Sequence, residues 1–291
     1  MKSINISHLE QPEISKVEMI DFYNEATEDY EFWSNDFNMH FGYFRPFNTN
    51  VLKRDSMLNE MNNQVMKRLQ INTKKHRLVD LGCGMGATMR HALKQFKKLI
   101  AYGVTLSEFQ VKQGNELLKG KNGIIIKENY NNTSFPSNSF DSAVAIESFC
   151  HSGHDKKSIK EAFRILKSGG RLVIADAFLK KEVSQLPSGS HFAYRRLCDH
   201  FSLEKIEQIH NYKQELKQVG FSNVKIEDIS FRVAPSVFHV PFAIVGFILK
   251  TLWNTKSLKR ESLHNLKGSY YALLSGLHIK SFGYYIITAT K

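Results

Sequence analysis

The sequence predicts an α/β protein built on a doubly wound, parallel sheet with helices on both faces. Short apolar segments alternate with helical segments from residue 77 to residue 176, which is the pattern of parallel strands joined by crossover helices. The first apolar segment also runs directly into three glycines at alternate positions, Gly82, Gly84 and Gly86. Glycines at this spacing allow a sharp strand-to-helix turn and a close approach of the backbone to a ligand.

The core elements are expected in alternating order along the chain. Strands are predicted at 77–81, 99–104, 123–127, 142–146 and 171–176, and helices follow the first two strands at 87–97 and 107–119. Ser107 and Gln110 have the spacing of a capping box, so the second helix should begin at Ser107. A further helix is expected over 155–167, with Asp155 as its N-cap and Gly169 and Gly170 at its end.

The segments outside this core predict two additions to the sheet. Residues 16–70 read as helices, and we expect residues 1–70 to form an N-terminal helical lid on a core of residues 71–230. Residues 231–282 are expected to form a helical cap, and residues 283–291 a final core strand. The cap contains the apolar run 240–249, which is shorter than the ~20 residues that cross a bilayer. A helix lining an apolar substrate pocket is the preferred interpretation, and an interfacial helix is the alternative.

The composition is that of an ordinary globular protein. Of the 291 residues, 42% are hydrophobic and 23% are charged, which excludes neither an enzyme nor a binding module. Three cysteines, Cys83, Cys150 and Cys198, lack the number and spacing of a disulfide framework. The polar N-terminus lacks the apolar core of a secretory signal. We therefore expect a cytoplasmic protein with reduced thiols.

The net charge of +12 raises the question of an anionic partner. The lysines are scattered along the chain, and no sequence signature of an RNA-binding module accompanies them. A generally basic surface explains them, so no nucleic-acid partner is expected. An anionic small substrate or peripheral contact with a membrane surface stays open.

The glycine turn is compatible with two kinds of cofactor. Gly82-x-Gly84-x-x-Ala87 satisfies a relaxed dinucleotide-binding fingerprint, which requires an acidic residue roughly 20 positions further on for a ribose hydroxyl. The second strand instead ends in Gly103-Val104-Thr105, and the next acidic residue is Glu108 inside the following helix. The sequence therefore argues against a nicotinamide or flavin dinucleotide.

The alternative rests on a resemblance. Asp80-x-Gly82-x-Gly84-x-Gly86 resembles the first motif of the class I S-adenosylmethionine (SAM) dependent methyltransferases, and four later segments agree with that family in order and spacing: 103–110, 135–141, 145–152 and 164–172. Within the family, the segments 103–110 and 147–148 resemble the branch of tocopherol, sterol and prenyl-diphosphate C-methyltransferases. The segment 40–43 resembles the H-x-G-Y segment of that branch, and the ending 282–288 resembles its tocopherol group.

This resemblance implies a fold and a cofactor site. The fold is a Rossmann-like sheet of seven strands, mostly parallel with the last strand antiparallel, with the N-terminal lid and the cap described above. Gly82, Cys83 and Gly84 would line the methionine part of SAM, with Asp80 near its sulfonium and amino end. The remaining contacts implied are Thr105 and Leu106 at the ribose and adenine, Gln110 closing that wall, Asn129 against the adenine amine with Tyr130 beside it, and Tyr23 and Tyr43 as an aromatic lid. Many relatives carry Asp where this chain has Asn129.

The residues around 147–155 are the candidates for catalysis. Glu147 would face the transferred methyl group and act as a base, or stabilise a carbocation left after a methyl group adds to an alkene. An acceptor hydroxyl or amine would instead require a proton acceptor such as His151 or His154. His151-x-x-His154-Asp155 lacks a third convincing ligand nearby, so no metal site is expected. Arg195, Arg196 and His200 can either hold a diphosphate or form a solvated helix face, and the second interpretation is preferred.

The function expected is SAM-dependent methyl transfer to a small hydrophobic metabolite of secondary metabolism. The preferred acceptor is isoprenoid-like (a terpenoid, prenyl diphosphate or prenylquinol) and is methylated at carbon. The alternative is N- or O-methylation of a natural product or alkaloid. An RNA methyltransferase and a non-catalytic SAM-binding module are less favoured. A hydrophobic small-molecule substrate and a homodimer are the expected partners.

Overall fold

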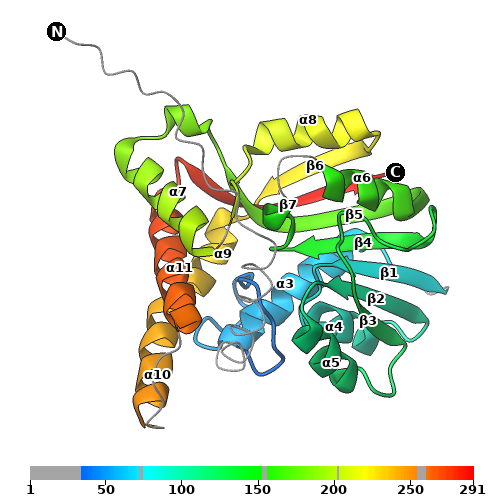
Figure 1. Cartoon of the computed structure of the whole chain (residues 1–291), viewed down its shortest axis with the longest axis horizontal. Helices are drawn as coiled ribbons and strands as arrows, with labels where there is room; N and C mark the ends of the chain where they lie inside the picture. The colour runs from blue at the N-terminus through cyan, green and yellow to red at the C-terminus, as the bar shows by residue number, and fades with distance from the viewer. Residues whose placement is uncertain (1–33, 72–74, 153–155, 202, 254–259) are drawn as a thin grey trace.

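A single seven-stranded sheet forms the centre of the computed structural model, which describes residues 34–71, 75–152, 156–201, 203–253 and 260–291 (Figure 1). The strand order is β3-β2-β1-β4-β5-β7-β6. The first five strands pair in parallel, and β7 is antiparallel to both of its neighbours. This confirms the expected sheet. The strands are β1 His76–Leu81, β2 Leu99–Thr105, β3 Gly123–Lys127, β4 Phe140–Ile146, β5 Leu166–Leu179, β6 Ser222–Asp228 and β7 Phe282–Thr290.

Helices cover both faces of this sheet. Among the described residues they are α3 Arg54–Leu69, α4 Ala87–Gln95, α5 Glu108–Leu117, α6 Lys157–Ile165, α7 Ser188–Phe201, α8 Ile209–Val219, α9 Ser230–Val237, α10 Val240–Trp253 and α11 Arg260–Leu277, with short 3₁₀ turns η2 Phe149–His151 and η3 Val183–Gln185. Three of them, α9 to α11, lie between β6 and β7 in the chain. None of the described helices is long and apolar enough to cross a membrane.

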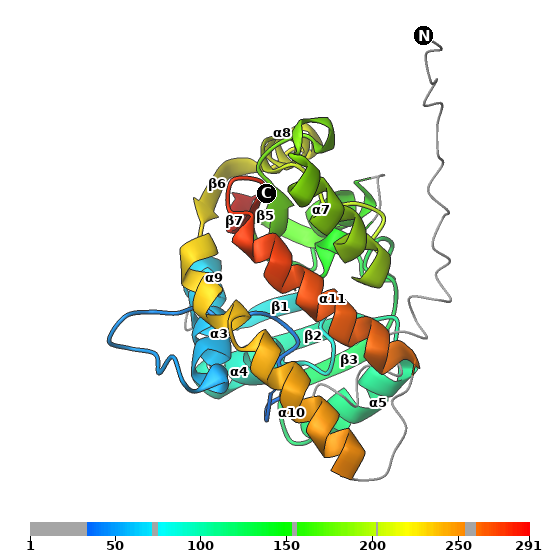
Figure 2. The same cartoon turned by 90° about the vertical axis from the view of Figure 1, so that its left-hand side faces the viewer.

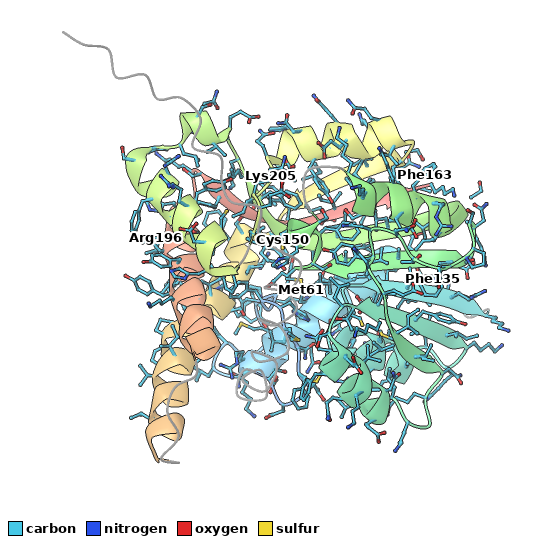
Figure 3. The ribbon with its side chains drawn as sticks, viewed as in Figure 1. Met61, Phe135, Cys150, Phe163, Arg196 and Lys205 are labelled. Carbon is cyan, nitrogen blue, oxygen red and sulfur yellow. The ribbon has the colours of Figure 1, made fainter. Side chains whose placement is uncertain are left out.

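The core consists of two apolar layers, one on each face of the sheet. Side chains of α6 and α8 pack with Leu172 and Ile174 of β5 on one face. Side chains of α3, α4 and α9 pack with Val173 and Ala175 of the same strand on the other face. Figure 3 labels Met61 of α3 and Phe163 of α6, which belong to these opposite layers. Adjacent strand residues thus serve different layers, as expected for a sheet buried on both faces.

Two local expectations were wrong. Residues 34–53 form turns and extended chain rather than helix, because their backbone packs directly on α3: a side chain at Gly42 would lie 2.5 Å from Cβ of Met57. Gly169 and Gly170 do not end a helix, since α6 ends at Ile165 and the two glycines belong to β5. Their backbone groups pair with Lys291, whose carbonyl accepts from Gly169 N and whose N–H donates to Gly170 O, both at 2.9 Å. Asp155 lies outside the described residues.

The site described next lies at the edge where the parallel strands end. From β1 the chain adds β2 and β3 on one side and then β4 and β5 on the other side. The strand order therefore reverses between β1 and β4. Open α/β sheets bind ligands outside the carboxyl ends of their strands at such a reversal. The residues that follow β1 and β4 are Gly82 and Glu147, so both candidate segments meet at this point.

Candidate active site

The turn from β1 into α4 depends on its three glycines. Gly82, Gly84 and Gly86 have φ values of 96°, 53° and 74°, a region that residues with a Cβ rarely adopt. The N–H groups of Gly82 and Cys83 both donate to Val104 O at 3.0 Å, which anchors the turn to β2. Among the described residues, a side chain at Gly84 would meet only the thioether of Met39, with the sulfur 2.9 Å away. Because this unbranched side chain can move, a ligand can approach the backbone at Gly84 from that side.

Asp80 brings a carboxyl group to the same turn. It is buried near the end of β1, and this burial raises its pKa to about 7. Among the described residues no hydrogen bond to its carboxylate offsets the loss of hydration. A buried carboxylate without such compensation is stabilised by a cation. The site therefore fits the cationic methionine end of SAM.

The end of β2 and the start of α5 form a second wall. Thr105 Oγ1 donates to Gln110 Oε1 at 2.6 Å, and Ser107 Oγ accepts from Gln110 N at 3.2 Å as the expected N-cap. Leu106 between them is half-buried. Met39 Sδ lies 3.9 Å from Gln110 Nε2 and also against Gly84. The structure thus brings Thr105, Leu106 and Gln110 together beside the glycine turn.

Three other candidates use their side chains within the protein. Asn129 Oδ1 accepts from Asn131 N at 2.9 Å, which closes a local turn. The Tyr130 hydroxyl donates to Ser148 O at 2.7 Å, so this ring supports the Glu147 segment. The Cys83 side chain belongs to a core cluster with Met89, so only the Cys83 backbone can face a ligand.

Glu147 immediately follows β4 and is held by two distant parts of the chain. Its Oε1 accepts from Phe41 N and from the Tyr284 hydroxyl, each at 2.7 Å. Burial raises the pKa of Glu147 to about 8, although both hydrogen bonds favour the ionised form, and nearby Asp176 raises it further. Its φ of 46° is unusual for a residue with a long side chain, and such strain is concentrated at functional sites.

The Glu147 segment packs directly on the glycine turn. Ser148 Oγ donates to Leu81 O at 2.6 Å, and a side chain at Gly82 would lie 2.4 Å from Cβ of Ser148. Glycine is therefore needed at position 82 for two reasons, the positive φ and the close contact with Ser148. The two strongest motifs of the sequence form one continuous site.

The segment 40–44 lies between Glu147 and α9. Gly42 N donates to Ser236 Oγ at 2.8 Å, and Phe44 N donates to Arg232 O at 2.7 Å, both on α9. Tyr43 is half-buried and packs on the core layer that includes α3 and α9. Because Phe41 N bonds to Glu147, this segment connects α9 to the carboxyl group.

The remaining sequence candidates are placed less centrally. His151 ends η2, and its N–H donates to Ser148 O at 3.1 Å. Arg195 and Arg196 are exposed on α7, and the Arg196 guanidinium lies over the ring of Phe192. Tyr23 and His154 lie outside the described residues. Sequence reasoning did not assign roles to Tyr284, Ser148 and Ser236, although Tyr284 stands in the ending noted for its resemblance to the tocopherol group.

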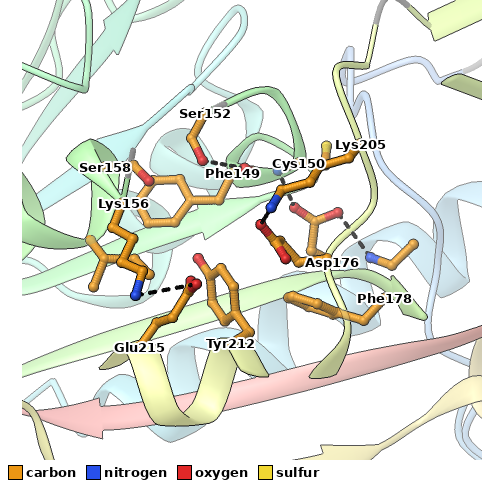
Figure 4. Close-up of a pocket in the computed structure, with 13 residues that line it drawn as sticks. Phe149, Cys150, Ser152, Lys156, Ser158, Asp176, Phe178, Lys205, Tyr212 and Glu215 are labelled. Carbon is orange, nitrogen blue, oxygen red and sulfur yellow. Dashed lines mark hydrogen bonds and ion pairs between the residues drawn. The ribbon is translucent and has the colours of Figure 1, made fainter. Parts of the chain in front are cut away.

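A small pocket lies next to this site, between η2, β5 and α8 (Figure 4). Asp176 at its wall accepts from Cys150 N at 3.1 Å and from Ala177 N at 2.8 Å, and burial raises its pKa to about 6. The buried hydroxyl of Tyr212 and that of Ser158 have no hydrogen-bond partner among the described residues. The pocket therefore suits a small polar group or ordered water.

Comparisons with known proteins agree with this geometry. Residues 79–174 match the family model of a methyltransferase domain. A Streptomyces halstedii methyltransferase, GfsG, is 23% identical over 224 residues, which are 75% of this chain and 78% of that protein. A sterol 24-C-methyltransferase of Yarrowia lipolytica is 27% identical over 233 residues, which are 76% of this chain but only 58% of that protein.

Two further similarities concern the reactions that similar proteins catalyse and the fold. A SAM-dependent Diels–Alderase of Talaromyces variabilis, iccD, is 26% identical over 231 residues, covering 73% of this chain and 76% of that protein. Among solved structures, a geranyl diphosphate methyltransferase bound to its diphosphate and sinefungin has a TM-score of 0.73 at 18% identity, covering 94% of this chain and 98% of that one. At this identity the match shows the fold alone.

Proposed function

Because this chain is a class I SAM-dependent methyltransferase, we propose that it methylates a carbon atom of a lipophilic, isoprenoid-like acceptor. The observation that carries the proposal is the position of Glu147. Its carboxyl group ends β4 at the sheet reversal and is oriented by Phe41 N and the Tyr284 hydroxyl. A carboxyl held this firmly beside the glycine turn is suited to accept a proton in the reaction.

The chemistry explains why a carboxyl is needed there. SAM supplies an electrophilic methyl group on a cationic sulfur. When a methyl group adds to a carbon–carbon double bond, a cation forms on the neighbouring acceptor carbon. That intermediate loses a proton from an adjacent carbon to the Glu147 carboxylate, and the C–H electron pair forms the new double bond. The raised pKa of Glu147 makes it a better proton acceptor in its ionised form.

The chain's other residues would bind and orient the two substrates. Asp80 would face the amino and sulfonium end of SAM, and the backbone of Gly82, Cys83 and Gly84 would line its methionine part. Thr105, Leu106 and Gln110 would form the wall at the ribose and adenine, with Asn129 near the adenine amine. Tyr43 and Met39, from the segment over the turn, would exclude water. Correct positioning of two reactants can supply ~7–11 kcal/mol of the barrier.

The acceptor class is supported by the cap and by the relatives. Val233 and Val237 of α9 pack in the same apolar layer as Phe41 and Tyr43 of the 40–44 segment. Relatives and structural neighbours act on sterols and on geranyl diphosphate. Both kinds of acceptor are isoprenoids with alkenes, for which a single carboxyl base is sufficient.

The proposal is tested by product analysis with isotope-labelled SAM. The protein is incubated with methyl-labelled SAM and a panel of a sterol, a prenyl diphosphate, a prenylquinol, an alkaloid amine and a phenol. We expect one labelled methyl group on carbon in an isoprenoid product, located by NMR. A label on nitrogen or oxygen would overturn the proposal in favour of the alternative, for which the sequence offers His151 as a proton acceptor. The similarity to a Diels–Alderase gives a second outcome to check. An acceptor that isomerises or cyclises without gaining a labelled methyl group would also overturn the proposal.

A further inference from the structure

The outer surface of the cap exposes apolar side chains that no described part of the protein covers. Phe242, Val245 and Leu249 are 76%, 56% and 62% exposed. Their spacing of three and four residues places them on one face of α10. Phe238, in the turn before α10, continues this face and is also exposed. The helix packs chiefly on α11 and projects beyond the sheet (Figures 1 and 2). We name these four residues, together with Leu52, the α10 surface.

Leu52 joins this surface from a distant part of the chain. It is 84% exposed in the loop before α3. The His239 ring donates from Nε2 to Val51 O at 2.7 Å, which fixes that loop beside the start of α10. Two segments separated by almost two hundred residues therefore present large apolar side chains at one place. Contiguous exposed apolar side chains on a folded protein indicate an interaction surface.

The sequence segments that form and flank the α10 surface are mainly basic. Residues 233–260 contain Lys250, Lys256, Lys259 and Arg260 and no acidic residue. The loop segment 45–54 adds three basic residues, Arg45, Lys53 and Arg54, and again no acidic one. The cap sequence 231–282 has seven lysines and arginines against one glutamate, a net charge of +6 out of the chain's +12. Half of the excess charge is thus carried by fewer than a fifth of the residues.

We propose that the α10 surface docks on an anionic lipid bilayer, with α10 lying in the plane of the interface. Exposed Phe, Val and Leu side chains on one face of a helix, in a stretch of sequence whose charged residues are lysine and arginine, fit an interfacial helix. The 14 residues of α10 extend ~21 Å, less than the ~30 Å hydrocarbon core, so the helix lies on the membrane instead of spanning it. Two copies of this chain would bring like charges together at this surface, whereas anionic headgroups would neutralise them.

The test measures vesicle binding and does not depend on the acceptor. The full chain is sedimented with vesicles of phosphatidylcholine alone and with vesicles containing phosphatidylglycerol. We expect binding to the anionic vesicles only, weakened by added salt. The double variant Phe242→Gln/Leu249→Gln should lose at least tenfold in vesicle binding. Leu117→Gln/Ile124→Gln, which changes two exposed apolar residues on α5 and β3, is the matched control and should bind as the wild type does. Unchanged SAM binding shows that both variants fold.

Three outcomes of the binding and assembly measurements would overturn the proposal. The first is no binding to anionic vesicles at low salt, and the second is equal binding by the Phe242→Gln/Leu249→Gln variant. The third is a lipid-free dimer that this variant converts to monomer, because the α10 surface would then be an interface between two copies. Phe242→Cys with a polarity-sensitive fluorophore gives an independent readout. Its emission should report water in the lipid-free protein and an apolar environment on anionic vesicles, and a probe already shielded without lipid would show that the chain covers this surface itself.

Discussion

The hydroxyl of Tyr284 donates a 2.7 Å hydrogen bond to Oε1 of Glu147, which connects the antiparallel strand β7 to the end of β4 across β5. The same hydroxyl lies 3.4 Å from Ala175 O on the intervening strand. Tyr284 is buried, so this bond is shielded from water. In the proposed reaction Tyr284 is a positioning residue, because it acts on the acceptor only through Glu147.

Replacement of Tyr284 by Phe is expected to lower kcat by about tenfold, the effect of one hydrogen bond to a charged group worth ~1.5 kcal/mol. Since the lost bond favours the ionised carboxyl, the pKa of Glu147 should rise and the acidic limb of the pH–rate profile should move to higher pH. The neighbouring change Tyr285→Phe, on the opposite face of β7, is the matched control. A Tyr284→Phe profile with the wild-type midpoint would contradict the positioning role.

Replacement of Gly82 by Ala is expected to lower the free energy of unfolding by about 2 kcal/mol or more, since it combines an unfavourable φ with a clash against Ser148. Gly169→Ala is the control, because Gly169 has a φ of 75° but open space around its Cβ position. Chemical denaturation measures both. The second variant Gly82→Ala/Ser148→Gly should recover part of the loss. Equal destabilisation by the two single variants would show that the contact with Ser148 is unimportant.

The parts of the fold that the sequence predicted are those determined locally. The three glycines, the Ser107 cap and the apolar strands each depend on neighbours within a few residues, and all were confirmed. Segments whose conformation depends on distant partners were not predicted. Residues 34–53 carry no local signal for the contact between Gly42 and Met57, and Gly169-Gly170 reads as a helix stop until its pairing with Lys291 is known.

The same distinction applies to the site. Glu147 was proposed from the resemblance of its segment to a methyltransferase motif, whereas its partner Tyr284 lies 137 residues further on and belongs to an apolar strand with no polar periodicity. The place of Tyr130 beside the adenine stays a prediction from the resemblance, and the bond from its hydroxyl to Ser148 O was not predicted. A tyrosine in an apolar strand does not reveal from sequence which buried carboxyl it will meet.

Replacement of Asp80 by Asn is expected to weaken SAM binding and to remove most of its pH dependence. In the wild type, Asp80 has a pKa near 7, so it becomes ionised, and attracts the cationic ligand, as the pH rises through that value. SAM affinity should therefore increase from about pH 6 to about pH 8 in the wild type, and stay low and flat in Asp80→Asn, with a loss of about tenfold at the upper pH. Isothermal titration calorimetry measures both curves. An unchanged pH dependence in the variant would assign the titration to another group.

Replacement of Glu147 by Gln is expected to change how stability depends on pH. The folded pKa of about 8 exceeds the ordinary value of 4.5, so between these values the unfolded chain gives up a proton that the folded chain keeps. The wild type therefore loses stability as the pH rises from about 5 to about 8, by at most ~1.4 kcal/mol per pH unit from this group. Glu147→Gln lacks this loss, because Gln can still accept both hydrogen bonds and never ionises.

The Tm of the variant relative to the wild type should increase with pH over this interval, measured by thermal denaturation without SAM. Asp80 and Asp176 have pKa values raised in the same direction, so a residual decline should persist in the variant. A Tm difference independent of pH would mean that Glu147 is already ionised in the folded protein.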